Sequence, residues 1–357
     1  MLAVTRQTML RKFMMNVFPG GQVLRNSAAY SALLQRPICI RKIRAGRDRG
    51  GLRPQHLTGL ELIHAIFGGK LENAFVTSTS IVLQPDVPKF AKEYFFEADA
   101  QTAGSVALLL QTCLPCLTFL PSKSLVVLKG GTDAIKAPLI DYSILVLQPL
   151  LRKFLRMQVD FRTIKRGFYP RGGGVVEVRV EPQREALPAL DLVDRGQVTR
   201  ILCRGVVSGR LALDVAQRMA KTASVHLSKR LPEVPVEIEA FREQKEVSAA
   251  DGGFLLLVAE TSTGCLFGAS LLAEKGVTAE TIGKDAAREL FDELSSGACV
   301  DQVTNQLAFK PVLCCWTTVR SDCFDCVLLP CSDSGCRISS SSTWRWRGDT
   351  LACWQGR

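Results

Sequence analysis

The chain has 357 residues, of which 47% are hydrophobic and 22% are charged, and its formal net charge is +11. This composition excludes a largely disordered chain, because enough apolar surface is available for a substantial core. The length suits one large domain or two smaller ones, and the basic balance favours a polyanionic partner, with nucleic acid ahead of an anionic membrane.

The start of the chain is basic: its first 47 residues contain no aspartate or glutamate. Arginine and lysine among apolar residues at the very beginning are also typical of a mitochondrial presequence. We favour an altered first exon over a targeting segment. The most apolar stretch, residues 106–120, contains Gln111 and Pro115 and is too short to span a bilayer, so no membrane partner is expected.

Alternating strand and helix patterns follow along the chain and predict an α/β or α+β fold. A break at residues 181–191 suggests a linker, after which a second unit begins at about residue 199. The expected elements are a strand within 36–47, a loop at 46–55, a helix at 57–67, a strand at 80–85, a buried helix from 102, a strand at 124–132, a helix at 139–155, a glycine loop and strand at 166–180, a strand at 199–207, a helix at 212–231, a strand pair within 254–271 and a helix at 281–297.

The composition changes after Leu307, where all four tryptophans and seven of the thirteen cysteines lie. No helical or strand period persists there, so residues 308–357 are predicted to form an aberrant, disordered tail. The spacings Cys323-x2-Cys326 and Cys331-x4-Cys336 allow a zinc site, but no histidine is near and we expect no metal. The six earlier cysteines are expected to be buried, reduced thiols.

The strongest candidate site is a basic loop with six cations against the single acid Asp48. Guanidinium groups bind phosphate oxygens in pairs, so a row of phosphates is the natural ligand; a solvated charged face is the alternative. The cations are Arg41, Lys42, Arg44, Arg47, Arg49 and Arg53.

A second candidate is the glycine-rich loop KRGFYPRGGG, where Lys165, Arg166 and Arg171 flank backbone that could cradle phosphate. It is no Walker motif, since a strand rather than a helix follows, and a plain turn is equally compatible. Gln111 within an apolar helix needs a hydrogen-bond partner, either a nucleotide base edge or a neighbouring carbonyl.

The chain has three histidines, His56, His64 and His226. His56 borders the basic loop and could contact phosphate, or could cap or pack the turn. The other two lie in predicted helices and are expected to be partly exposed.

Several segments together resemble the RNA 3'-terminal phosphate cyclase family. They occur in family order over residues 20–306: GGQVLR, IRKIRAGR, GLRPQHLTGLELI, TAGSVALLLQ, LKGGTDA, APLIDY, RGFYPRGGG, ETSTGCLFGAS and GACVDQ. The related cyclase-like proteins of ribosome assembly match less well.

The resemblance implies an α+β fold, with a large domain of repeated units, each a four-stranded sheet with two helices, and a smaller inserted α/β domain. The large domain would comprise residues 1–184 and 281–307, and the insert residues 185–280. The resemblance also implies ATP-dependent conversion of an RNA 3'-phosphate to a 2',3'-cyclic phosphate, with Mg²⁺, through enzyme–AMP and RNA–adenylate intermediates. A nuclear location follows from the family alone.

By resemblance, Gln111, Pro138 and Gln306 would contact ATP. Gln22, Arg25, Arg44, Arg47, Arg53, Lys165, Arg166 and Arg171 would bind phosphate or RNA.

Three departures from the family pattern matter. The family's early glutamate is replaced in the stretch Phe18-Pro19-Gly20, and the later nucleotide-contacting cluster keeps only Gln306. The nucleophilic histidine of the family should follow that cluster, yet no histidine occurs after His226. We therefore expect no catalytic histidine in this chain, which is either an inactive form of a cyclase or a non-catalytic RNA- or nucleotide-binding relative.

Overall fold

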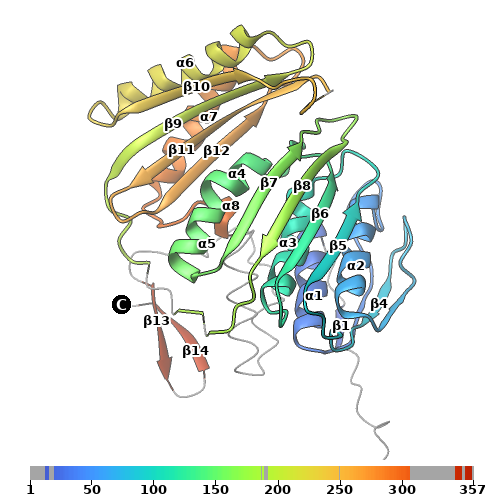
Figure 1. Cartoon of the computed structure of the whole chain (residues 1–357). Coiled ribbons are helices and arrows are strands. Elements are labelled where there is room, and N and C mark those ends of the chain that lie inside the picture. Colours follow the sequence, from blue (N-terminus) through green and yellow to red (C-terminus); the bar gives the residue numbers. More distant parts are fainter. Residues whose placement is uncertain are drawn as a thin grey trace, which may run out of the picture.

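The computed structural model describes residues 13–15, 20–185, 187–188, 192–248, 250–305, 342–347 and 350–355 (Figure 1). The expected ATP contact Gln306 and most of the predicted tail lie outside these residues. The fold is α+β, as the alternation of patterns predicted, and contains three four-stranded sheets together with the strand pair β13 (Ser342–Arg347) and β14 (Thr350–Gln355).

The first sheet has the strand order β1-β2-β4-β3, in which β1 is parallel to β2 and the other neighbours are antiparallel. Its elements are β1 (Phe13–Met15), α1 (Gly21–Leu33), β2 (Ile38–Ile40), α2 (Pro54–Phe67), β3 (Lys70–Glu72) and β4 (Ile81–Gln84).

The second sheet repeats this topology with the order β5-β6-β8-β7, again with one parallel pair followed by antiparallel neighbours. Its strands are β5 (Tyr94–Asp99), β6 (Ser124–Gly130), β7 (Val159–Lys165) and β8 (Gly174–Val180). Its helices are α3 (Val106–Thr118) and the continuous helical segment α4 (Ile140–Tyr142), η1 (Ser143–Leu147) and α5 (Gln148–Leu155).

The third sheet has a different order, β10-β9-β11-β12. Its elements are β9 (Val198–Ser208), α6 (Leu213–Arg230), β10 (Val236–Arg242), β11 (Gly252–Thr261), β12 (Leu266–Leu272) and α7 (Ala279–Ser295), followed by α8 (Gln302–Thr304). The predicted boundaries between a large domain and an insert stay a prediction.

Alternating residues of β11 face two different cores, so this strand is buried on both sides. Leu255 and Leu257 pack against α6 and α7, whereas Phe254 and Leu256 join the core of the first two sheets. Figure 1 shows α4 between the second and third sheets. The period-two alternation of strands explains how one strand serves both cores.

The predicted strand at 36–47 is the least accurate of the expected elements, because only residues 38–40 pair. Lys42 and Arg44 adopt positive φ values of 55° and 52°, which turn the chain out of the sheet. The helix α1 and the strands β1, β3, β5, β7 and β10 were not anticipated, nor were β13 and β14, which lie within the segment predicted to be disordered. The predicted buried thiols are confirmed for the six cysteines before residue 307, all of which are buried and free.

None of the helices within the described residues is long and apolar enough to cross a membrane.

A buried hydrogen-bond network joins the helical segment to the third sheet. The Tyr142 hydroxyl donates to Oδ1 of Asp301 at 2.5 Å, and the backbone N–H of Gly268 donates to Oδ2 at 2.7 Å. The backbone N–H of Thr304 also donates to Oδ1, at 2.7 Å. A buried carboxylate is costly unless its lone pairs are satisfied, so this network fixes α4, β12 and α8 relative to one another.

Replacement Tyr142→Phe should destabilise the fold by about 1–3 kcal/mol, because the buried Asp301 carboxylate loses a donor. The free energy of unfolding in urea measures this effect. Tyr169→Phe is the matched control, since Tyr169 is 64% exposed. An unchanged unfolding midpoint for Tyr142→Phe would contradict the role given to the network.

Candidate anion-binding site

Three loops meet at one edge of the second sheet. β5 and β6 are parallel, so their carboxyl ends lie at the same edge, and β8 begins there because it runs antiparallel to β6. The backbone N–H of Gly131 donates to the carbonyl of Gly104 at 2.8 Å, and that of Thr132 donates to Gly167 at 2.9 Å. The segments TAGSVALLLQ, LKGGTDA and RGFYPRGGG therefore converge at this edge.

The first sheet's unit reaches this edge through the start of α2. Oε1 of Gln55 accepts a hydrogen bond from the backbone N–H of Ser105 at 3.1 Å, just before α3 begins. Gln55 had not been recognised as a site residue, since nothing local in the sequence distinguishes it from other helix-start glutamines. This contact brings the basic loop beside the amino end of α3.

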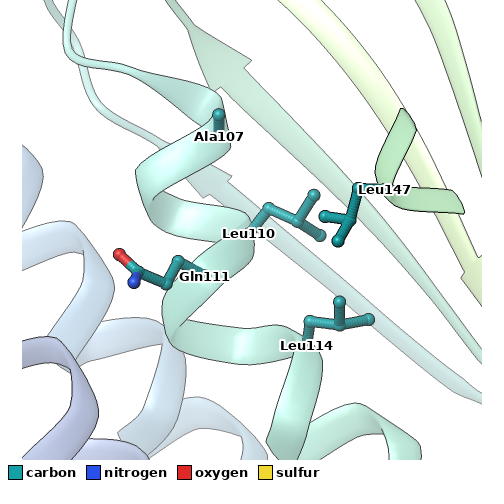
Figure 2. Close-up of a pocket in the computed structure, with 5 residues that line it drawn as sticks. All are labelled: Ala107, Leu110, Gln111, Leu114 and Leu147. Carbon is teal, nitrogen blue, oxygen red and sulfur yellow. The ribbon is translucent and has the colours of Figure 1, made fainter. Parts of the chain in front are cut away.

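Gln111 connects α3 to α1. Its Oε1 accepts a hydrogen bond from Nε of Arg25 at 2.8 Å, and the side chain is only 4% exposed. In Figure 2 its amide projects away from the side of α3 where Leu110, Leu114 and Leu147 line a small hollow. A guanidinium is thus one partner of this buried amide.

Burial lowers the pKa of Arg25 to about 10, which still leaves it charged at neutral pH. Residue 21 lies close to the side chains of both Arg25 and His56 and must be glycine. A Cβ at this position would lie 2.7 Å from Nε2 of His56 and 3.1 Å from Nη1 of Arg25. The close approach of α1 to α2 therefore sets the position of Arg25 beside His56.

His56 is buried on the first turn of α2 and is neutral. Its Nδ1 accepts a hydrogen bond from the backbone N–H of Arg53 at 3.2 Å, so Nε2 carries the proton. Burial lowers the pKa of His56 to about 4, with further lowering by Arg25, Arg44 and Arg53. The expectation that His56 caps or packs the turn agrees with this geometry.

The basic loop is held by one of its own arginines. Nη1 of Arg44 donates to the carbonyls of Arg49 and Gly51, each at 3.2 Å. The pKa of Arg44 is lowered by burial first and then by Arg53 and Arg47. These cations repel one another, and the loop offers only one acid, Asp48, to offset them.

We call Arg25, Arg44, Arg47, Arg53 and His56 the arginine cluster, because Arg25, Arg44 and Arg53 act on His56 and Arg47 acts on Arg44. Among the described residues, no carboxylate lies within 4.0 Å of the guanidinium groups of these four arginines. An unneutralised group of cations with one partly buried member is suited to bind a multiply charged anion.

Arg166, unlike the arginines of the cluster, is surrounded by carboxylates. It is buried, and it forms ion pairs with Asp141 at 2.5 Å, Glu243 at 2.7 Å and Asp133 at 3.4 Å. Burial acts against its charge, but Asp133 and Asp141 outweigh burial and raise the pKa of Arg166. Its guanidinium links the second sheet's unit to the segment after β10, so we leave it out of the phosphate site.

The other expected contacts occupy varied positions. Lys165 and Arg171 are exposed at the same edge of the second sheet. Gln22 lies one turn before Arg25 on α1, and Pro138 lies two residues before α4. No described contact joins Lys165, Arg171 or Pro138 to the arginine cluster, and their proposed roles stay predictions.

The site fits the phosphates of a nucleotide better than it fits a metal held by protein ligands. The described residues contain no group of three or more histidine, cysteine, aspartate or glutamate side chains placed to hold a metal ion. The Mg²⁺ implied by the resemblance would thus have to be held by nucleotide phosphate oxygens rather than by the arginine cluster.

Converging glycine loops beside an arginine cluster without a described carboxylate partner have a geometry suited to phosphate. Comparison with known sequences identifies the family. The chain belongs to the RNA 3'-terminal phosphate cyclase family, whose sequence pattern matches residues 16–322.

Individual relatives agree with this assignment. A protein of Dictyostelium discoideum, named a probable RNA 3'-terminal phosphate cyclase, is 38% identical over 284 residues, which are 79% of this chain and 65% of the relative. RNA 3'-terminal phosphate cyclases of Desulfurococcus amylolyticus and Pyrobaculum aerophilum are 38% and 37% identical, each over 79% of this chain and 78% of the relative. The chain thus spans less than two thirds of the Dictyostelium relative. The family match ends inside the predicted tail, so the boundary at Leu307 stays a prediction.

The titration of His56 tests the arginine cluster directly. Its NMR signal should titrate near pH 4, because burial and three neighbouring cations disfavour the imidazolium. Between about pH 6.5 and pH 4 the unfolded chain binds a proton that the folded chain does not, so His56 contributes a loss of stability as the pH falls through this window.

In the variant Arg25→Gln the pKa of His56 should rise, since one cation is removed. Arg152→Gln is the control, because Arg152 lies on α5 and is not among the groups that act on His56. A His56 pKa near 6.5 in the unmodified protein would show that the cluster is not assembled as described.

Proposed function

We propose that this chain binds ATP and RNA ends that carry a 3'-phosphate at the arginine cluster, and that it does not adenylate itself. The proposal rests on four arginines that have no carboxylate partner among the described residues, three of which act on a buried, neutral histidine. This arrangement supports recognition of phosphate, and the family supports the two ligands.

Two guanidinium groups of the cluster are held in position before any ligand binds. The Gln111 amide holds the Arg25 guanidinium, and the loop carbonyls hold that of Arg44. Little side-chain entropy is therefore lost when an anion arrives, and charge-assisted hydrogen bonds replace cation repulsion. A terminal phosphate carries more charge than an internal phosphodiester, so the cluster should favour RNA ends.

The family reaction needs a histidine that attacks the α-phosphate of ATP, and we propose that none of the three histidines does so. The lone pair of Nδ1 in His56 accepts the Arg53 N–H, and the other ring nitrogen, Nε2, carries the proton. His64 lies eight residues further along α2, about 12 Å away by helix rise, and His226 is on α6. The chain therefore retains a binding site without a placed nucleophile.

The lack of a placed nucleophile also favours a second candidate function. This is a non-catalytic RNA-binding role like that of the cyclase-like proteins of ribosome assembly. Phosphate recognition does not depend on a nucleophile, so both candidates use the same cluster. A nuclear location is part of either proposal and rests on the family alone.

ATP binding should weaken about tenfold or more in Arg25→Gln, because a charged hydrogen-bond donor contributes about 1.5–3 kcal/mol. Calorimetric titration measures the dissociation constant, and Arg152→Gln should bind as the unmodified protein does. Equal affinity for ATP in both variants would place nucleotide binding elsewhere.

Incubation with ATP labelled on the α-phosphate, together with Mg²⁺, tests the missing nucleophile. The denatured chain should retain no label, while a family enzyme treated in parallel should retain it. Acid-labile label on this chain would contradict the proposal and would make His56 the first residue to replace.

A further inference from the structure

We propose that Phe75 is a stacking platform for an unpaired base of single-stranded RNA whose 3'-phosphate occupies the arginine cluster. This inference rests on the proposed function and extends it to a second contact with the same RNA. Phe75 lies in the turn between β3 and β4, and it is 57% exposed, so its ring is accessible to a ligand.

The turn that carries Phe75 is fastened to the basic loop by backbone hydrogen bonds. The N–H of Thr77 donates to the carbonyl of Leu52 at 2.8 Å, and the N–H of Leu52 donates to the carbonyl of Ser78 at 2.9 Å. The N–H of Ile43 donates to the carbonyl of Thr79 at 3.0 Å. Since Phe75 is two residues from Thr77, its Cα lies within roughly 7 Å of this paired backbone.

The backbone of the basic loop and that of the turn between β3 and β4 lie so close together that the choice of residue is restricted in both segments. Gly51 has a φ of +74°, and a Cβ there would lie 2.1 Å from the carbonyl oxygen of Thr77. Thr77 itself has a φ of 77°, a rare conformation for a β-branched residue. Such a conformation persists only where surrounding contacts determine it, so the turn presents Phe75 on a fixed backbone.

The charge beside this turn identifies the occupant. The basic loop offers Arg44, Arg47 and Arg53, which have no carboxylate partner among the described residues. Single-stranded nucleic acid needs both features at once: cations for its phosphates and aromatic faces for its bases. An apolar partner protein would leave the arginines unpaired, and a base-paired duplex would offer Phe75 no free base.

The test uses RNA of about eight nucleotides with a 3'-phosphate and 2-aminopurine near that end, and a nucleoside 3',5'-bisphosphate that occupies the cluster alone. Phe75→Ala should weaken binding of the RNA about tenfold and should abolish the quenching of 2-aminopurine that stacking causes. Its dissociation constant for the bisphosphate should stay within about twofold of the unmodified protein's, since the arginines are untouched. Phe75→Tyr should restore both affinity and quenching.

Phe95→Ala is the matched control, because Phe95 is 63% exposed but belongs to β5 of another sheet. It should bind the RNA as the unmodified protein does. A blunt RNA duplex with the same 3'-phosphate should show no dependence on Phe75.

Two results would overturn the inference while leaving the proposed function intact. Phe75→Ala could bind and quench the RNA as the unmodified protein does, or it could lose affinity equally for the RNA and the bisphosphate, which would indicate a disturbed loop. If the unmodified protein bound neither ligand, the proposed function would fail and this inference with it.

Discussion

The arrangement of the candidate site depends on a positive charge that no carboxylate among the described residues neutralises. Arg25 enters a partly buried position, where its guanidinium meets the Gln111 amide instead of a carboxylate. Burying an unpaired charge opposes folding, and two more arginines, Arg44 and Arg53, act with Arg25 on the same histidine, His56. The packing of α1, α2 and α3 holds this arrangement together, and an anionic ligand would relieve the repulsion.

Arg166 shows how the protein surrounds another buried arginine with carboxylates. Three carboxylates surround it, and the resulting ion pairs connect the second sheet's unit with the segment that follows β10. Removing one partner from such a buried set would leave charge uncompensated, which is strongly destabilising. The Arg166 guanidinium is thus paired within the fold. The arginine cluster has no such carboxylate among the described residues and can accept an anionic ligand.

Local patterns in the sequence were sufficient for most elements and for the basic loop. The helix at 57–67 was expected because Leu60 and Ile63 recur at helical spacing, and both are buried on α2. The role of Arg166 could not be predicted, because its partner Glu243 is 77 residues away along the chain. The link between Arg25 and Gln111 spans 86 residues, and only the packed helices reveal it. Phe75 was overlooked for the same reason, since its significance comes from a loop more than twenty residues earlier in the chain.

The central claim is that the arginine cluster recognises the terminal phosphate of an RNA. Two single-stranded RNAs that differ only in a 3'-phosphate or a 3'-hydroxyl, titrated at one fixed salt concentration, test it most directly. The account predicts that the phosphate-ended RNA binds about tenfold more tightly and that this preference disappears in Arg25→Gln. Equal affinity for the two RNAs in the unmodified protein would mean that the cluster holds nucleic acid only through its backbone charge, and the account of the site would be wrong.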